Sequence, residues 1–343
     1  MLAMKKHSLF LLFALPITAA VMLFCVCVGS VAVPLGDTLT ALWSGLTGVE
    51  GPGGAMESII LDVRLPRVLA AALVGASLSL CGACMQGLLR NPLADGSTLG
   101  VSSGASLGAA FAILIGFQLP GLPLTGTALM AMGFAFVSLV TILSLAFSLD
   151  RSLSTHTIIL LGIVFAMLVS ALLSLLIVFS GEKLRTITFW TMGSLSSVGY
   201  PGVALLSVSL AVSCALLLPQ ATALDAFALG EDTALHLGVS VRRVKLLVLA
   251  TVSALIGVCV SVGGCIGFVG LVTPHMARLL VGPGHRRLLP ASLFGGAWFL
   301  MLTDLASRAL IPRVQLPIGA VTSIIGSALF VWIFARSSRK EAA

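Results

Sequence analysis

Two arginines three residues apart stand at the start of a long apolar stretch, in the sequence Asp62-Val63-Arg64-Leu65-Pro66-Arg67, and Arg308 lies near the end of another. The guanidinium group is planar and pairs with a carboxylate or a phosphate through parallel hydrogen bonds. Two uses for these side chains follow from this chemistry. They can recognise carboxylates of a partner, or they can anchor the chain to lipid phosphates at a membrane interface.

Histidine and hydroxyl side chains are the other groups that could act chemically. His275 follows Thr273-Pro274 and has no second candidate ligand at metal-binding spacing, so we interpret it as structural. A polar run at the start of an apolar stretch could instead face a pathway and form a gate: Ser154, Thr155, His156 and Thr157. No metal site is expected, and the chain is not expected to bind a cofactor.

Nucleotide chemistry needs a partner. The sequence contains no G-x-x-x-x-G-K-[ST] motif, the loop that cradles nucleotide phosphates. We therefore expect no catalytic residues in this chain, and any ATP and Mg²⁺ would be bound by a separate ATPase subunit.

The composition sets the class of protein that must position these residues. Of 343 residues, 58% are hydrophobic and 9% are charged, which is too little polar surface to cover a soluble globule. The net charge of +7 comes from residues in short loops without aromatic interleaving, so nucleic-acid binding is not expected. The sequence predicts an all-α, polytopic membrane protein.

Apolar stretches of about 20 residues predict spanning helices. The chain is predicted to form a single membrane domain with about ten spans. These spans are 8–33, 65–89, 97–117, 122–149, 152–180, 199–218, 246–264, 266–282, 290–311 and 317–335. Glycines at four-residue spacing, as in Gly100, Gly104 and Gly108 or Gly263 and Gly267, predict close packing of helices.

Basic residues predict the orientation. With both termini in the cytoplasm, 13 of the 19 Lys and Arg residues lie inside and 6 lie outside, as the positive-inside rule requires. The chain is expected to cross its membrane many times. Four of the six exceptions are Arg64, Arg67, Arg308 and Arg313, at short outer ends of helices.

The longest predicted cytoplasmic segment is 219–245. Its pattern indicates two short helices, 222–229 and 231–237, joined at Gly230 and ended by Gly238. Glu231 and Asp232 suit the positive end of the second helix dipole. An ordinary surface helix pair would read in the same way. A rigid pair below the membrane would also suit contact with a soluble ATPase.

Motifs along most of the chain resemble one known family, the permease subunits of bacterial ABC importers for iron complexes (siderophores or haem) and cobalamin. The resemblance covers about residues 30–335. It is carried by RLPRVLAAALVG (64–75), QGLLRNPLAD (86–95), LGVSSGA (99–105), FWTMGSL (189–195), LGED (229–232), GFVGLVTPH (267–275), HRRLLP (285–290) and LPIGAVT (316–322). The chain departs from the family pattern at Gln315, where glutamate is frequent.

The resemblance implies a homodimer of ten-span subunits in the bacterial cytoplasmic (inner) membrane. Two copies of an ATP-binding subunit would lie below it, and a periplasmic or lipid-anchored substrate-binding protein would lie above it. Arg64, Arg67 and Arg308 would then dock onto glutamates of the binding protein. In the coupling segment, Ala228, Gly230, Glu231, Asp232 and Leu237 would contact the ATPase, and Gly238 would end the second helix.

Two other functions stay open from the sequence. An ion-coupled secondary transporter would normally need buried ionisable residues, and the predicted spans contain almost none besides His156, His275 and Asp304. Asp304 stands four residues before Arg308 and can pair with it along a helix. The second is a membrane receptor or scaffold without transport. Neither function explains both the outer arginines and the 219–245 helix pair.

Overall fold

The computed structural model describes residues 2–29, 33–48, 53–95, 99–119, 123–150, 154–311 and 314–341, and the regular structure in these ranges is helical. The longer helices are α1 (Leu2–Cys27), α2 (Leu35–Thr47), α4 (Leu65–Leu89), α5 (Val101–Ile115), α6 (Pro123–Leu149), α7 (Thr155–Val178), α9 (Tyr200–Leu217), α12 (Val241–Gly263), α13 (Val269–Val281), α14 (His285–Ala309) and α15 (Ile318–Glu341). The shorter ones are α3 (Ala55–Ser58), the π-helix η1 (Ile59–Arg64), η3 (Gly181–Lys183), α8 (Leu184–Thr191), η4 (Leu218–Gln220), α10 (Ala221–Ala228) and α11 (Glu231–His236).

Each of the predicted spans overlaps one long helix. Among the described residues, six helices are long and apolar enough to cross a membrane, and four shorter apolar helices accompany them. The prediction of an all-helical membrane protein is therefore confirmed. Helix α4 matches the predicted range 65–89, whereas α1 ends at Cys27 and not at residue 33.

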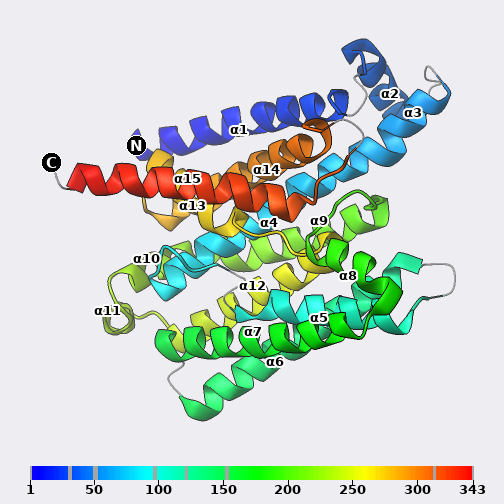
Figure 1. Cartoon of the computed structure of the whole chain (residues 1–343). Coiled ribbons are helices and arrows are strands. Elements are labelled where there is room, and N and C mark those ends of the chain that lie inside the picture. The colour runs from blue at the N-terminus through cyan, green and yellow to red at the C-terminus, as the bar shows by residue number, and fades with distance from the viewer. Residues whose placement is uncertain are drawn as a thin grey trace.

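Helix α4 forms the centre of the bundle. It packs against α14, α13, α12 and α9. In the continuous helical stretch Ala55–Leu89, which includes α4, 83% of an apolar 18-residue segment is buried. The corresponding figure for α7 is 17%, so α7 turns most of its surface outward, as expected for a lipid-facing helix. Figure 1 shows α1, α14 and α15 on one side of α4, and α5, α6 and α7 on the other side of α12.

Glycines let the helices around α4 approach closely. A Cβ on Gly75 of α4 would lie 2.2 Å from the carbonyl oxygen of Gly296 in α14, and one on Gly82 would lie 1.8 Å from that of Gly270 in α13. Gly104 of α5 packs against Ser138 of α6 in the same way, as its spacing predicts. The prediction is wrong for Gly267, which lies before α13 and not within a helix. A Cβ on Gly267 would lie 3.8 Å from Ser323 Oγ, which is an ordinary contact distance.

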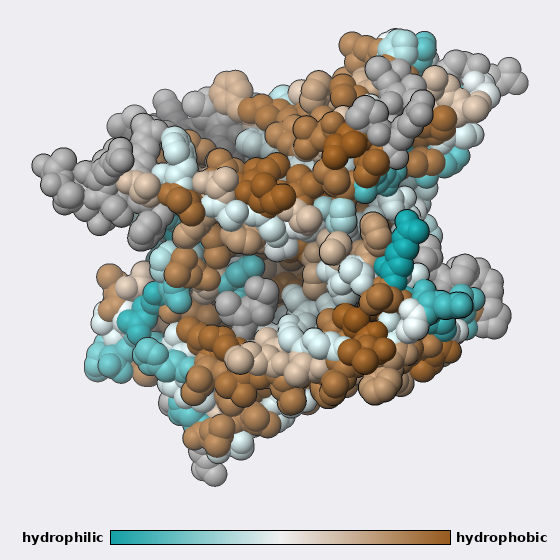
Figure 2. Space-filling model, viewed as in Figure 1, coloured by the Kyte–Doolittle hydropathy of each residue, from teal (hydrophilic) through white to brown (hydrophobic). Residues whose placement is uncertain are grey.

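Polar residues gather at the two ends of the bundle. Figure 2 shows a largely apolar surface over the long helices, with polar residues around α10 and α11 at one end and near α2 and α3 at the other. Helix α1 begins and α15 ends at the end that carries α10 and α11. The two candidate sites lie at opposite ends.

Candidate functional site

The first site is built where a π-helix meets α4. Because Pro66 has no N–H, it cannot complete the α-helical hydrogen-bond pattern of the preceding turn, and that turn is the π-helix Ile59–Arg64. Arg64 and Arg67 stand on either side of this proline, and each is 7% exposed. The two arginines thus point into the bundle, where no unpaired charge would be stable.

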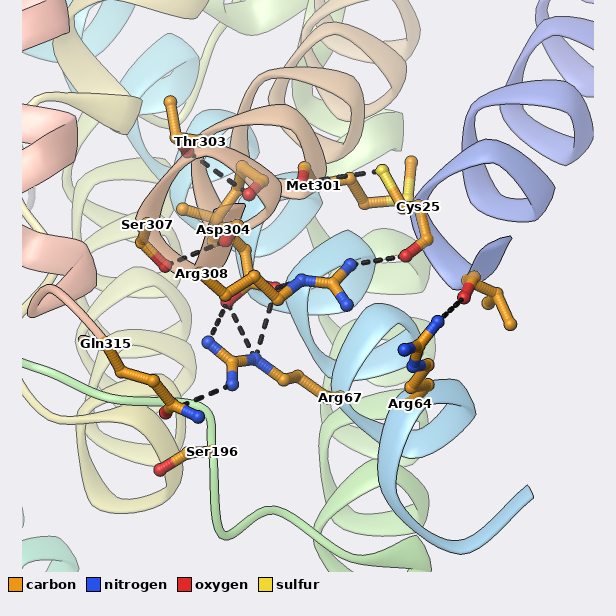
Figure 3. Close-up of polar contacts among 12 residues, drawn as sticks. Cys25, Arg64, Arg67, Ser196, Met301, Thr303, Asp304, Ser307, Arg308 and Gln315 are labelled. Atoms are coloured by element: carbon orange, nitrogen blue, oxygen red, sulfur yellow. Dashed lines mark hydrogen bonds and ion pairs between the residues drawn. The ribbon is translucent and has the colours of Figure 1, made fainter. Parts of the chain in front are cut away.

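Asp304 of α14 is the counter-ion of this region. Arg67 donates from Nε to Asp304 Oδ1 at 3.0 Å and from Nη2 to the same oxygen at 2.9 Å. Arg308 Nε lies 3.3 Å from Asp304 Oδ2, one helical turn along α14. Asp304 is 1% exposed, and Figure 3 shows the two guanidiniums converging on its carboxylate. The predicted pairing of Asp304 with Arg308 is confirmed.

The carboxyl end of α1 closes this site. Arg64 Nη1 donates to the carbonyl oxygens of Val26 at 2.9 Å and Cys27 at 3.1 Å, and Arg308 Nη2 donates to that of Cys25. These carbonyls belong to the last turn of α1, which lacks helical partners and carries the negative end of the helix dipole. Two arginines from different parts of the chain therefore cap one helix.

We call Arg64, Arg67, Asp304 and Arg308 the arginine cluster. Two guanidiniums share one carboxylate in it, and Arg67 also donates from Nη1 to Gln315 Oε1 at 3.5 Å, where the family pattern often has glutamate. The cluster is thus positively charged. Its low exposure disfavours anchoring to lipid phosphates. A docking protein could contact only the small exposed part of these side chains, which are already bonded inside the bundle. Docking stays a prediction. Arg313 lies outside the described residues.

The second site is the segment 219–245 at the opposite end. Helices α10 and α11 form close to the predicted ranges, joined at Gly230, whose φ of +115° is rarely adopted by residues with a side chain. Gly238 follows α11 with φ +83°. Of the residues predicted to contact an ATPase, Ala228, Asp232 and Leu237 are exposed, whereas Gly230 and Glu231 are partly buried. The contact itself stays a prediction.

Helix α10 is tied to the membrane helices by one acidic side chain. Asp225 Oδ1 accepts a hydrogen bond from the His285 backbone N–H at 2.9 Å and lies 2.7 Å from His285 Nδ1. It therefore caps α14 and holds the first side chain of that helix. Phe227 is fully buried beside it. The sequence pattern did not single out Asp225, because its partner is 60 residues away.

The four predicted gate residues have different surroundings. Ser154 caps α7, since its hydroxyl accepts from the Thr157 N–H at 3.4 Å, and the two hydroxyls are 2.8 Å apart. His156 is exposed. Thr155 is buried and donates to Glu231 Oε1 at 3.1 Å, so the structure joins a predicted gate residue to a predicted coupling residue. A gating role stays a prediction for all four.

Among the residues that the structure describes, no group of three or more His, Cys, Asp or Glu side chains is arranged to hold a metal ion. His275 packs beside Phe330, with ring centroids 6.2 Å apart.

The fold and the two sites define a polytopic helical membrane protein with a positive cluster at one end and a polar helix pair at the other. A family model, that of the FecCD transport family, matches residues 17–336, and the chain belongs to this family.

Relatives of known name cover most of the chain. It is 41% identical to the uncharacterized ABC transporter permease protein YvrB of Bacillus subtilis, over 91% of this chain and 89% of that protein. It is 39% identical to the hemin transport system permease protein HmuU of Yersinia pestis (84% and 86%) and 38% identical to the vitamin B12 import system permease protein BtuC of Citrobacter koseri (82% and 84%).

The fold is also similar to a solved structure, described as an inward-facing conformation of a metal-chelate type ABC transporter. The TM-score is 0.81 at 30% identity, covering 96% of this chain and 99% of that one. The similarity thus covers nearly the full length of both chains.

Proposed function

We propose that this chain is the membrane-spanning permease subunit of an ATP-driven importer. The observation that carries this function is the match of the FecCD transport family to residues 17–336 of an all-helical membrane fold. Relatives at 38–41% identity over more than four fifths of the chain are permease proteins by name, and one of them is named an ABC transporter permease. The chain is a multi-pass protein of the bacterial cytoplasmic membrane.

The proposed topology has ten spans and both termini in the cytoplasm. Figure 1 supports it, because α1 begins and α15 ends beside α10 and α11, the polar pair that we assign to the cytoplasm. The basic residues that follow this pair, Arg242 and Arg243, agree with that side. Two such subunits would form a homodimer with the pathway between them.

The partners follow from the two ends. The sequence has no P-loop, so hydrolysis is assigned to two copies of an ATPase subunit that bind the exposed face of α10 and α11. At the other end, the positive charge of the arginine cluster would attract acidic side chains of a substrate-binding protein, which raises the rate of association and fixes its orientation.

The proposed cargo is a bulky iron chelate, a siderophore or haem complex, or cobalamin. This class rests on relatives that are named hemin and vitamin B12 permeases and on the metal-chelate type structural neighbour. The permease needs no strong site for such a cargo if the binding protein supplies the selectivity.

The alternative, an ion-coupled secondary transporter, is not favoured. Within the described residues, Asp304 is the one fully buried carboxylate, and it is held by Arg67 and Arg308. A carboxylate that is neutralised by two guanidiniums is poorly suited to bind and release a cation.

ATP hydrolysis in proteoliposomes tests the proposal. The chain is purified with an ATPase subunit and a binding protein encoded beside it, and hydrolysis is followed as binding protein loaded with haem, ferric siderophore or cobalamin is added. We expect an assembled complex whose hydrolysis rises with one of the loaded forms. Failure of any ATPase subunit to associate would refute the proposal.

A further inference from the structure

Glu231, the first residue of α11, touches two membrane helices at once. Its Oε2 lies 2.6 Å from Lys245 Nζ, near the start of α12, and its Oε1 accepts a hydrogen bond from Thr155 Oγ1, at the start of α7, at 3.1 Å. One carboxylate thus joins the short helix pair to two long helices from distant parts of the chain.

Burial makes the link to Lys245 a strong one. The Lys245 side chain is 1% exposed, whereas that of Glu231 is 26% exposed. A buried ammonium group that loses its carboxylate is strongly destabilised, because water cannot replace the lost interaction. Helix α11 cannot slide along the bundle without drawing Lys245 with it or breaking this pair.

The neighbouring carboxylate faces the other way. Asp232 is exposed, as are Leu235 on the same short helix and Leu237 directly after it. Helix α11 therefore has an outer face that is open to a partner and an inner face that is bonded to α12 and α7. The two adjacent acidic residues are suited to different tasks.

Helix α12 carries this link into the bundle. Ile256, Cys259 and Val260, in its second half, line an internal cavity together with Val74 and Leu78 of α4. Because a helix moves nearly as a rigid body, a displacement at Lys245 is felt at these lining residues. The cavity is bordered by the central helix, α4, which the bundle holds on several sides.

We propose that Glu231 is a positioning residue that transmits the movement of the α10–α11 pair to α12 through Lys245 and to α7 through Thr155, and that it is not itself a contact of the ATPase. This inference rests on the proposed function. The contact surface for the ATPase is then the outer face of α11, with Asp232 and Leu237, and Glu231 determines how much of the ATPase movement reaches the membrane helices.

The test compares cargo uptake with ATP hydrolysis in proteoliposomes that contain the whole complex. The variants are Glu231→Gln/Lys245→Met, which removes both charges of the pair together, and Thr155→Val, which removes only the hydroxyl group. Glu182→Gln is the matched control, because Glu182 is exposed and lies outside the α10–α11 pair. Co-purification of the ATPase subunit and gel-filtration elution report assembly and folding.

We expect the double variant to assemble and to hydrolyse ATP, while cargo taken up per ATP falls about tenfold, the size of an ordinary coupling between sites. The ratio should also fall in Thr155→Val. In Glu182→Gln the ratio should stay unchanged. If the ion pair had only a structural role, the folded double variant would take up as much cargo per ATP as the wild type.

Two results would overturn the inference. One is a double variant that takes up as much cargo per ATP as the wild type. If the double variant does not fold, the same result in Thr155→Val would overturn the inference. The other is loss of ATPase co-purification in the folded double variant, which would make Glu231 a contact residue. Absence of ATP hydrolysis in the wild-type complex would instead refute the proposed function and is a separate outcome.

Discussion

At the scale of single residues, the main finding is that the outer arginines serve the structure before they serve a partner. Arg67 and Arg308 share the buried Asp304, and Arg64 and Arg308 cap the carboxyl end of α1. Any docking role must act through a cluster that is already bonded internally. In the proposed topology this end of the bundle lies outside, where basic residues are generally scarce, and these internal bonds would account for the arginines there.

Removing the shared carboxylate should destabilise the protein severely. Asp304→Asn leaves two buried guanidiniums without a counter-ion, a change that costs about 3–5 kcal/mol in comparable buried pairs. Thermal unfolding of the purified protein in detergent should shift to clearly lower temperature. Asp62→Asn is the matched control, since Asp62 is exposed. Equal stability of the two variants would show that Asp304 does not hold the cluster.

Docking can be tested at Arg64, whose Nη1 donates to the carbonyl oxygens of Val26 and Cys27. Arg64→Gln keeps a hydrogen-bond donor for α1 but removes the charge. Loss of one hydrogen bond to a charged partner should weaken binding of the substrate-binding protein about tenfold. Binding is measured with the assembled complex in nanodiscs. Arg185→Gln is the control, because Arg185 is an exposed residue of α8 outside the cluster. Unchanged affinity in Arg64→Gln would argue against docking at this residue.

At the scale of helices, close glycine contacts set the positions of α4, α13 and α14. Adjacent residues of α14 provide a sharp comparison: a Cβ on Gly296 would lie 2.2 Å from the Gly75 carbonyl oxygen, whereas one on Gly295 would meet nothing within 4 Å. Two helix backbones cannot move apart here without disturbing the salt bridge between Arg67 and Asp304, which joins the same two helices.

Alanine substitutions should therefore have opposite effects at neighbouring positions. Gly296→Ala should destabilise the protein by about 1–3 kcal/mol or more, because overpacking forces α4 and α14 apart. Gly295→Ala should be neutral or stabilise it by up to about 1 kcal/mol, since alanine favours helix. Yield of monodisperse protein and thermal unfolding measure both. A harmless Gly296→Ala would contradict the packing of α4 on α14.

The helices were more predictable than the contacts between them. Apolar length located α4 at 65–89 and turn-forming glycines located α10 and α11, because these signals are local. Helix α2 was not predicted, since it is amphipathic and shorter than a span. The Arg67–Asp304 pair could not be predicted either, because its partners are 237 residues apart and only the packing of α4 on α14 brings them together.

At the scale of the whole molecule, the two ends of the bundle are connected through few elements. The arginine cluster joins α4, α14 and α1, and the opposite end joins α10 to α14 through Asp225 and α11 to α12 through Glu231. Helix α14 therefore reaches from one site to the other. This continuity gives a structural route by which docking at one end and ATP hydrolysis at the other can affect each other.

The mechanism proposed for this protein is transport driven by ATP. Its most direct test is uptake of radiolabelled cargo into proteoliposomes that contain the permease and its ATPase, with loaded binding protein outside, ATP inside and an uncoupler present. We predict that uptake requires ATP and persists when the uncoupler has dissipated the proton gradient. Uptake that is lost with the uncoupler while ATP is held constant would contradict the account and identify an ion-coupled carrier.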